Sequence, residues 1–179
     1  MSINNIFIAT PIAGFLNKND YKMYKKLIEE MKETGAVLEF QLTSNVRLNN
    51  LSKLEKHPLK RYLENDIKCV QGTDGFGFYG TDDIADYDSP AASAAKDFNN
   101  VLNSEYFILL YPQRVVSSAL IELGYALAKG KKILIISSDK NALPYMALEL
   151  DKIYHNVTIK YSKFTFHNLF DYIKAFCCK

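Results

Sequence analysis

The sequence predicts an α/β fold, a single-domain parallel sheet flanked by helices. Three observations indicate it. Stretches typical of strands alternate with stretches typical of helices along the 179 residues. The clearest strands, 105–111 and 131–137, are apolar at successive positions instead of alternating with polar residues, as in strands covered on both faces. No internal repeat, low-complexity tract or linker divides the chain, which indicates a single domain.

The first half of the chain begins with a short apolar strand, 5–10, which stops at Thr10-Pro11. After a loop, an apolar stripe predicts a helix over 20–34, and Gly35 is placed to end it. Residues 36–44 are expected to form a strand. The polar stretch 45–72 is expected to be helical in part. Residues 73–90, rich in Gly, Asp and aromatics, indicate either a functional loop or a surface hairpin.

The second half has clearer boundaries. A helix is expected from Ser89-Pro90 to about Asn103, with proline at its first position. A second helix, 117–129, is closed by Gly130. The remaining expected elements are a short helix at 144–150, a strand at 156–161 and an amphipathic helix at 164–176.

Composition favours one compact domain over 1–179, because 48% hydrophobic residues suffice for a core and no linker or repeat is visible. A net charge of +2 does not indicate binding to nucleic acid or to a membrane surface. No apolar run reaches membrane-spanning length, and the N-terminus lacks a signal-peptide pattern. Three cysteines without CxxC spacing predict neither disulfides nor zinc. A cytoplasmic location is therefore expected.

Glu122 is the unusual residue, since it is charged within the otherwise apolar stretch 119–126. Parallel sheets bind ligands outside the carboxyl ends of their strands, which selects 10–15, 111–118 and 138–139. The helix that carries Glu122 starts at this edge. A carboxylate in apolar surroundings is costly unless it is paired or kept for chemistry.

Two structural explanations for Glu122 compete with a functional one. A capping box requires Ser or Thr three residues earlier, and that position is Ala119. An exposed glutamate favoured by the helix dipole stays open. On a helix, however, Glu122 neighbours small or hydrogen-bonding residues, Ser118, Ala119 and Tyr125 among them, as a pocket wall would. A functional carboxylate is the favoured hypothesis.

The segment YPQRVVSSALIELGYALAKGKKILII (111–136) is similar to the region around the catalytic glutamate of nucleoside 2-deoxyribosyltransferases. The same glutamate position recurs in TIR-like domains that cleave NAD. FIATPIAGF (7–15) resembles the first-strand loop of bacterial members, and KDFNNVLNSEYFILL (96–110) resembles the stretch with their sugar-binding aspartate, here Asp97. The similarity covers the first strand and roughly 89–137, and implies a flavodoxin-like, TIR-like three-layer sandwich.

The sequence departs at one place from the deoxyribosyltransferase pattern, and this distinguishes the transferases from the TIR-like domains that cleave NAD. The transferases usually carry an Asp-Ser-Gly-Thr-like run before the glutamate, whereas this chain has Val116-Ser117-Ser118-Ala119 and lacks the aspartate. A serine-containing approach looks more like the TIR-type NAD-cleaving branch. The resemblance thus implies cleavage of NAD, with a role in bacterial antiviral defence through NAD depletion or a signal sensed by a downstream effector.

In the resulting hypothesis Glu122 is the catalytic nucleophile or the stabiliser of an oxocarbenium-like transition state. NAD is a substrate, and neither a metal nor a further cofactor is expected. Three functions stay open: NAD cleavage, a nucleoside deoxyribosyltransferase or N-ribohydrolase activity, and non-catalytic nucleotide sensing. The resemblance also implies a homo-oligomer. The predicted substrate-binding residues are Thr10, Pro11, Phe15, Asp97, Ser118 and Tyr125.

Overall fold

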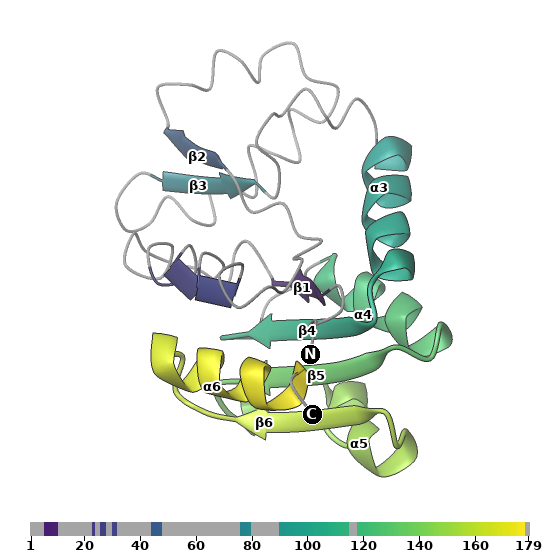
Figure 1. Cartoon of the computed structure of the whole chain (residues 1–179), viewed down its shortest axis with the longest axis vertical. Helices are drawn as coiled ribbons and strands as arrows, with labels where there is room; N and C mark the ends of the chain where they lie inside the picture. The colour runs from purple at the N-terminus through teal and green to yellow at the C-terminus, as the bar shows by residue number, and fades with distance from the viewer. Residues whose placement is uncertain are drawn as a thin grey trace.

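The computed structural model has a four-stranded parallel sheet as its centre (Figure 1). It describes residues 6–10, Met23, Lys26, Leu27, Glu30, Met31, the strands at 44–47 and 76–79, and residues 90–114 and 118–177. In the sheet order, β1 (Ile6–Ala9) is followed by β4 (Tyr106–Tyr111), β5 (Lys132–Ser137) and β6 (Val157–Tyr161), all parallel. The predicted α/β class with a parallel sheet is confirmed.

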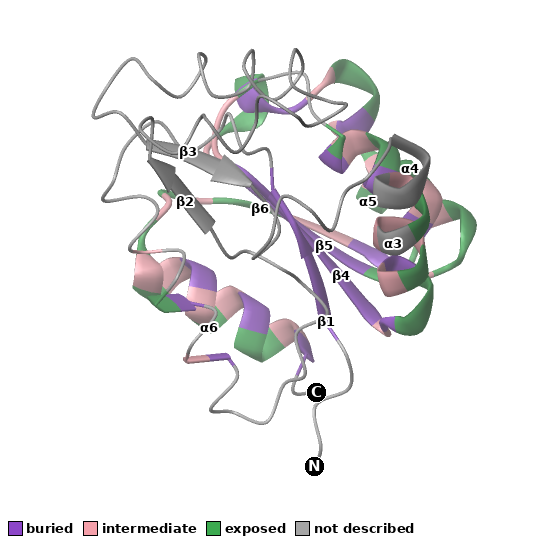
Figure 2. Cartoon of the chain, turned by 90° about the horizontal axis from the view of Figure 1, so that it is seen from above, coloured by how far each residue is buried: buried purple, intermediate pink, exposed green. Residues whose placement is uncertain are grey.

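Helices cover both faces of this sheet. Seen from above, the strands separate α6 (Phe166–Cys177) from α3 (Pro90–Asn103), α4 (Ala119–Ala128) and α5 (Leu150–Ile153) (Figure 2). Two 3₁₀ turns, Lys140–Ala142 and Tyr145–Ala147, precede α5. The short helix predicted at 144–150 corresponds to the second 3₁₀ turn, which begins directly after Pro144, and to the first residue of α5.

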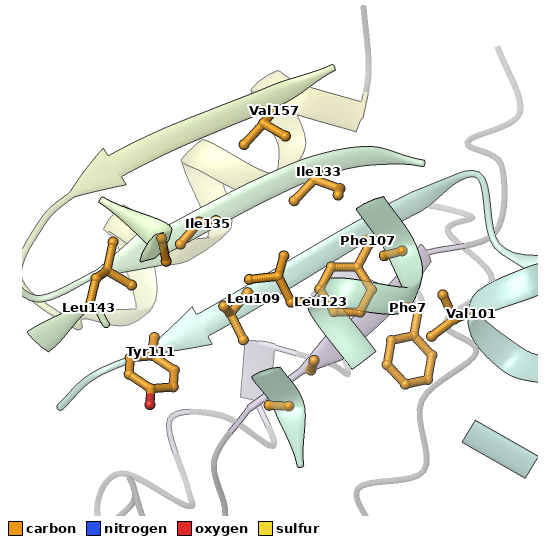
Figure 3. Packing of buried hydrophobic residues seen from close by; sticks show 14 residues of the cluster. Phe7, Val101, Phe107, Leu109, Tyr111, Leu123, Ile133, Ile135, Leu143 and Val157 are labelled. Carbon is orange, nitrogen blue, oxygen red and sulfur yellow. The ribbon is translucent and has the colours of Figure 1, made fainter. Parts of the chain in front are cut away.

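Alternate residues of the strands supply two separate apolar cores. On the α6 face, Ile6 and Ile8 pack with Ile108, Leu134 and Leu169. On the opposite face, the second core contains Phe7, Phe107, Ile133, Val101 from α3 and Leu123 from α4 (Figure 3). The rings of Phe7 and Phe107 stack with centroids 5.6 Å apart. Burial on both faces explains why β1, β4 and β5 read as continuous apolar runs, whereas the edge strand β6 is partly exposed.

Helix α4 ends where the sequence predicts. Gly130 has φ = 65°, a left-handed conformation that suits glycine. The Gly130 and Lys131 amides donate to the carbonyls of Leu127 and Ala126, both at 3.1 Å, which is the Schellman pattern. The Lys131 side chain also provides hydrogen-bond donors for the C-terminal end of α3. Its Nζ donates to the carbonyls of Leu102 (2.6 Å) and Ser104 (2.7 Å).

The middle of the chain differs from expectation. Strand β2 (Ser44–Arg47) pairs antiparallel with β3 (Phe76–Tyr79) in a separate two-stranded sheet. A strand was expected to end at Ser44, and a loop or hairpin was expected at 73–90. Because the partner of β3 lies about thirty residues earlier, this pairing is non-local and leaves no short-range pattern in the sequence. Residues 36–43 lie outside the described part of the chain.

Candidate functional site

Glu122 lies in the first turn of α4, which follows the carboxyl end of β4. Its amide donates to the carbonyl of Ser118 at 3.1 Å, so the backbone at this position is already helical. The residue is only 9% exposed. The alternative of a solvent-exposed glutamate beside the helix dipole is therefore wrong. The Ser118 side chain makes no capping hydrogen bond, so a capping arrangement does not account for Glu122 either.

Burial changes the charge state of Glu122. Removal from water, followed by the charge of Asp97, raises its pKa from 4.5 to about 8. Loss of hydration is the larger cause, and it always favours the neutral form of a carboxyl group. In the unliganded protein Glu122 is therefore mainly protonated at pH 7. A substrate that needs a carboxylate at this position must first displace that proton.

Asp97 is the second carboxylate of the site and comes from a different element, α3. The two helices pack together, and the rings of Phe98 and Tyr125 meet at 4.7 Å between centroids with 30° between their planes. Phe98 directly follows Asp97, and Tyr125 lies three residues after Glu122. The ring contact therefore joins α3 to α4, the two helices that carry the carboxyl groups.

The electrostatic interaction between Asp97 and Glu122 predicts how the pKa of Glu122 changes when the charge of Asp97 is removed. In Asp97→Asn, the pKa of Glu122 should fall but stay above 4.5, because burial remains. Titration of the glutamate carboxyl carbons by ¹³C NMR, with Glu122→Gln to identify the signal, measures this directly. An unchanged or raised pKa of Glu122 in Asp97→Asn would contradict the coupling.

Two other predicted residues lie on α4 with different surroundings. Ser118, at the N-cap, is exposed, and its carbonyl accepts from the amides of Ile121 (2.8 Å) and Glu122. Tyr125 is half-buried between Phe98 and Lys129, whose Nζ lies 5.3 Å from the centre of its ring. The structure thus gives Tyr125 a packing role between α3 and α4. Contact of either residue with a substrate stays a prediction.

Thr10 follows β1 at the same edge of the sheet. It is 8% exposed, and its Oγ1 makes no hydrogen bond within the described residues. In the register of the sheet Ala9 pairs with Leu109, so Thr10 is level with Leu110, near the carboxyl end of β4. The other two predicted residues of this loop, Pro11 and Phe15, lie outside the residues that the structure describes.

The carboxyl ends of β4 and β5 are joined by a buried serine. Ser137 Oγ lies 3.1 Å from both the Tyr111 and the Asp139 carbonyl oxygens and can donate to either. The Asp139 carboxylate accepts from the amides of Asn141 (2.7 Å) and Ala142 (3.1 Å), and so caps the following 3₁₀ turn. Positions 138–139, which the sheet rule selected for ligand binding, thus have local structural hydrogen bonds, and ligand contact there stays a prediction.

Sequence reasoning missed Phe98 and Ser137. Phe98 reads as one apolar residue of an amphipathic helix, and its contact with Tyr125 depends on how two helices cross. Ser137 reads as the last residue of a strand. Its position next to the edge was the available signal, because a buried hydroxyl there requires a partner.

Within the described ranges, no three His, Cys, Asp or Glu side chains gather as metal ligands would. The aspartates at 82, 83, 86 and 88, whose spacing is not that of an EF-hand loop, fall outside those ranges. Nor does any helix among the described residues combine the length and the apolar character required to cross a bilayer.

Comparison with known proteins gives partial sequence matches and structural matches over nearly the whole chain. No family model matches the sequence. Adenosine deaminase of Escherichia coli strain SE11 is 33% identical over 75 residues, which cover 41% of this chain and 22% of the relative. The same enzyme from strain E24377A matches with the same identity and coverage. The chain spans about a fifth of the length of these curated relatives.

Among solved structures, the Clostridium botulinum CMP N-glycosidase BcmB is similar over 96% of this chain and 98% of its own, with a TM-score of 0.59 and 17% identity. This likeness shows a shared α/β fold. A Sir2 enzyme covers 99% of the chain with a TM-score of 0.46 and 13% identity, which does not establish a common fold. The resemblance to deoxyribosyltransferases and TIR-like domains stays a prediction.

Proposed function

We propose that this protein cleaves the N-glycosidic bond of a nucleotide, with Glu122 as the catalytic carboxylate. The observation that carries the proposal is the buried Glu122 in the first turn of α4, beside Asp97 and at the carboxyl ends of parallel strands. A buried, strongly perturbed carboxyl group at such an edge is a candidate for catalysis. Cleavage generates positive charge on the ribose, which a carboxylate stabilises or attacks.

NAD⁺ is the first substrate candidate, in line with the sequence resemblance. Its nicotinamide ring is cationic, so it lowers the pKa of a nearby Glu122 and promotes loss of the proton. The carboxylate oxygen then bonds to the anomeric carbon while the C–N bond breaks. The bonding electrons pass to the pyridinium nitrogen, so nicotinamide leaves neutral without an acid. Water releases ADP-ribose and restores the carboxylate, or another nucleophile yields a cyclic or transferred product.

A nucleoside or nucleotide such as CMP is the second candidate. It is supported by the shared fold with an enzyme named for cleaving CMP and by the partial match to adenosine deaminases. A neutral base leaves poorly unless it gains a proton. In the Asp97–Glu122 pair, one proton is held up to about pH 8. Glu122, as the protonated member of the pair, can supply this proton while the negative charge of Asp97 stabilises the ribosyl cation.

The pH dependence of kcat/KM separates the two candidates. With NAD⁺, which needs ionised Glu122, kcat/KM should rise about tenfold per pH unit below pH 8 and level off above it. With CMP, which needs one proton on the pair, it should fall above pH 8. Initial rates between pH 5.5 and 9.5 check this, and a profile without a break near pH 8 would contradict a role for Glu122 ionisation.

The activity itself is tested by incubating the protein separately with NAD⁺, CMP and a nucleoside panel. Nicotinamide or a free base, identified by chromatography and mass, assigns the substrate class. Antiviral signalling to a downstream effector and assembly into a homo-oligomer are further proposals, supported by the sequence resemblance. Binding without turnover in every case would instead favour a nucleotide sensor.

A further inference from the structure

Strand β6 is the outermost strand of the sheet on the side away from β1, and among the described residues it pairs only with β5 (Figure 1). Two hydrogen bonds establish which of its backbone groups face β5. The Ile133 amide donates to the Asn156 carbonyl at 2.8 Å, and the Ser162 amide donates to the Ser137 carbonyl at 2.9 Å. Because backbone groups alternate along a strand, residues 157, 159 and 161 point theirs away from the sheet.

Most of these outward-facing backbone groups are unused. The Val157 amide donates to the Tyr154 carbonyl at 3.1 Å, so it is satisfied locally. No backbone hydrogen bond within the described part of the chain involves the Val157 carbonyl, the Tyr161 amide or either group of Ile159. A row of open donors and acceptors on an edge strand is a template for a further strand.

Exposed apolar side chains accompany this edge. Ile153 and Tyr154 lie just before β6 and are 73% and 41% exposed, and Tyr161 ends the strand with 37% exposure. Helix α5, which carries Ile153, contacts β6. Large apolar side chains next to unpaired backbone groups are typical of a surface that another protein chain covers.

The backbone pattern of β6 suits a second copy of the same strand. Two copies related by a twofold axis across this edge run antiparallel, so a register centred on Ile159 brings the open groups together. Each Ile159 then donates to and accepts from the partner's Ile159. Each Tyr161 amide donates to the partner's Val157 carbonyl, which is the acceptor that the Val157 amide leaves available.

The side chains favour the same register. Val157 lies opposite the partner's Tyr161, and the two Ile159 side chains lie opposite each other, so apolar groups meet apolar groups. Lys160 lies opposite the partner's Thr158. A register centred on Lys160 would instead place the two ammonium groups opposite each other, which is unfavourable. A register centred on Thr158 would leave the Tyr161 amide beyond the end of the partner's strand.

We propose that the free edge of β6 is a homodimer surface, at which two copies of this chain join their sheets antiparallel about a twofold axis at Ile159. Ile153 and Tyr154 then approach the partner's Tyr161 and are withdrawn from water. The inference goes beyond the proposed function and does not depend on it, because none of the candidate catalytic groups takes part. The sequence resemblance implies assembly but indicates no surface for it.

Tyr161→Pro and Tyr161→Val form a matched pair, because both remove the phenol ring and only proline removes the amide. This amide faces away from β5, so proline should leave the sheet intact, which circular dichroism checks. In sedimentation equilibrium, Tyr161→Pro should dimerise at least about tenfold more weakly than Tyr161→Val, since the hydrogen bonds to both Val157 carbonyls are lost. Equal dimerisation constants, or a wild-type chain that is monomeric at about 1 mM, would overturn the proposal.

The register is tested at Thr158, which also serves if Tyr161→Pro fails to fold. Thr158→Glu places a carboxylate opposite the partner's Lys160, so it should strengthen dimerisation several-fold at low salt. Thr158→Lys places like charges opposite each other and should weaken it by a similar factor. Melting of both variants at a concentration where the chain is monomeric accounts for effects within one chain. Changes in the same direction, or none, would overturn the register.

Discussion

Glu122→Gln is expected to reduce turnover by about a thousandfold or more. Glutamine nearly matches the shape of glutamate, so the packing of α4 should persist. It has no negative charge to stabilise the ribosyl cation and is not a nucleophile of comparable strength. The measurement is nicotinamide release from NAD⁺, or base release from CMP or a nucleoside, with circular dichroism to confirm the fold.

Glu149→Gln is the matched control. Glu149 has an exposed side chain that pairs with a nearby surface lysine, Lys152, at 2.5 Å. Surface pairs of this kind contribute little, so the variant should keep wild-type activity and stability. If Glu122→Gln retained turnover while folding normally, the catalytic assignment would be wrong.

The second large effect of Glu122→Gln is on stability, and it depends on pH. The folded state holds the Glu122 proton up to about pH 8, whereas the unfolded chain releases it near pH 4.5. Between these values the folded protein binds more protons, so its stability falls as pH rises. Because one pKa unit corresponds to about 1.4 kcal/mol, ionisable Glu122 costs about 3 kcal/mol at pH 7 and on the order of 4 to 5 kcal/mol above pH 8.

A glutamine side chain cannot ionise, so Glu122→Gln should not lose this folding stability as the pH rises. Urea unfolding at pH 4, 7 and 9 should show wild type and Glu122→Gln close together at pH 4. The variant should become progressively more stable than wild type at pH 7 and pH 9. A constant difference across the three pH values would show that Glu122 titrates normally in the folded protein.

Much of the sheet could be predicted because its central strands have short apolar centres that are buried on both faces. In the runs at 105–111 and 131–137 the charged residues stand at the start, and the structure places strands there with bounds within one residue. Glu122 could be singled out for the same reason, as a charge in an apolar stretch. These features are local, so the sequence displays them directly.

The features that could not be predicted depend on how helices and strands pack against one another. The influence of Asp97 on Glu122 arises because α3 packs against α4. The contact of Tyr125 with Phe98 joins two helices and leaves no signal in the spacing along either of them. The pairing of β2 with β3 is likewise set by contacts between distant segments. Fold class follows from local pattern, whereas the relation between two side chains of a site follows from tertiary packing.

Helix α3 is held in place at its C-terminal end by hydrogen bonds. The ammonium group of Lys131 ties the C-terminal carbonyls of α3 to the start of β5, and Asp97 lies almost two turns away from this anchorage. A small tilt about that anchorage displaces Asp97 more than the tied end. Because the charge of Asp97 contributes to the raised pKa of Glu122, a change in the position of α3 relative to α4 would change that pKa.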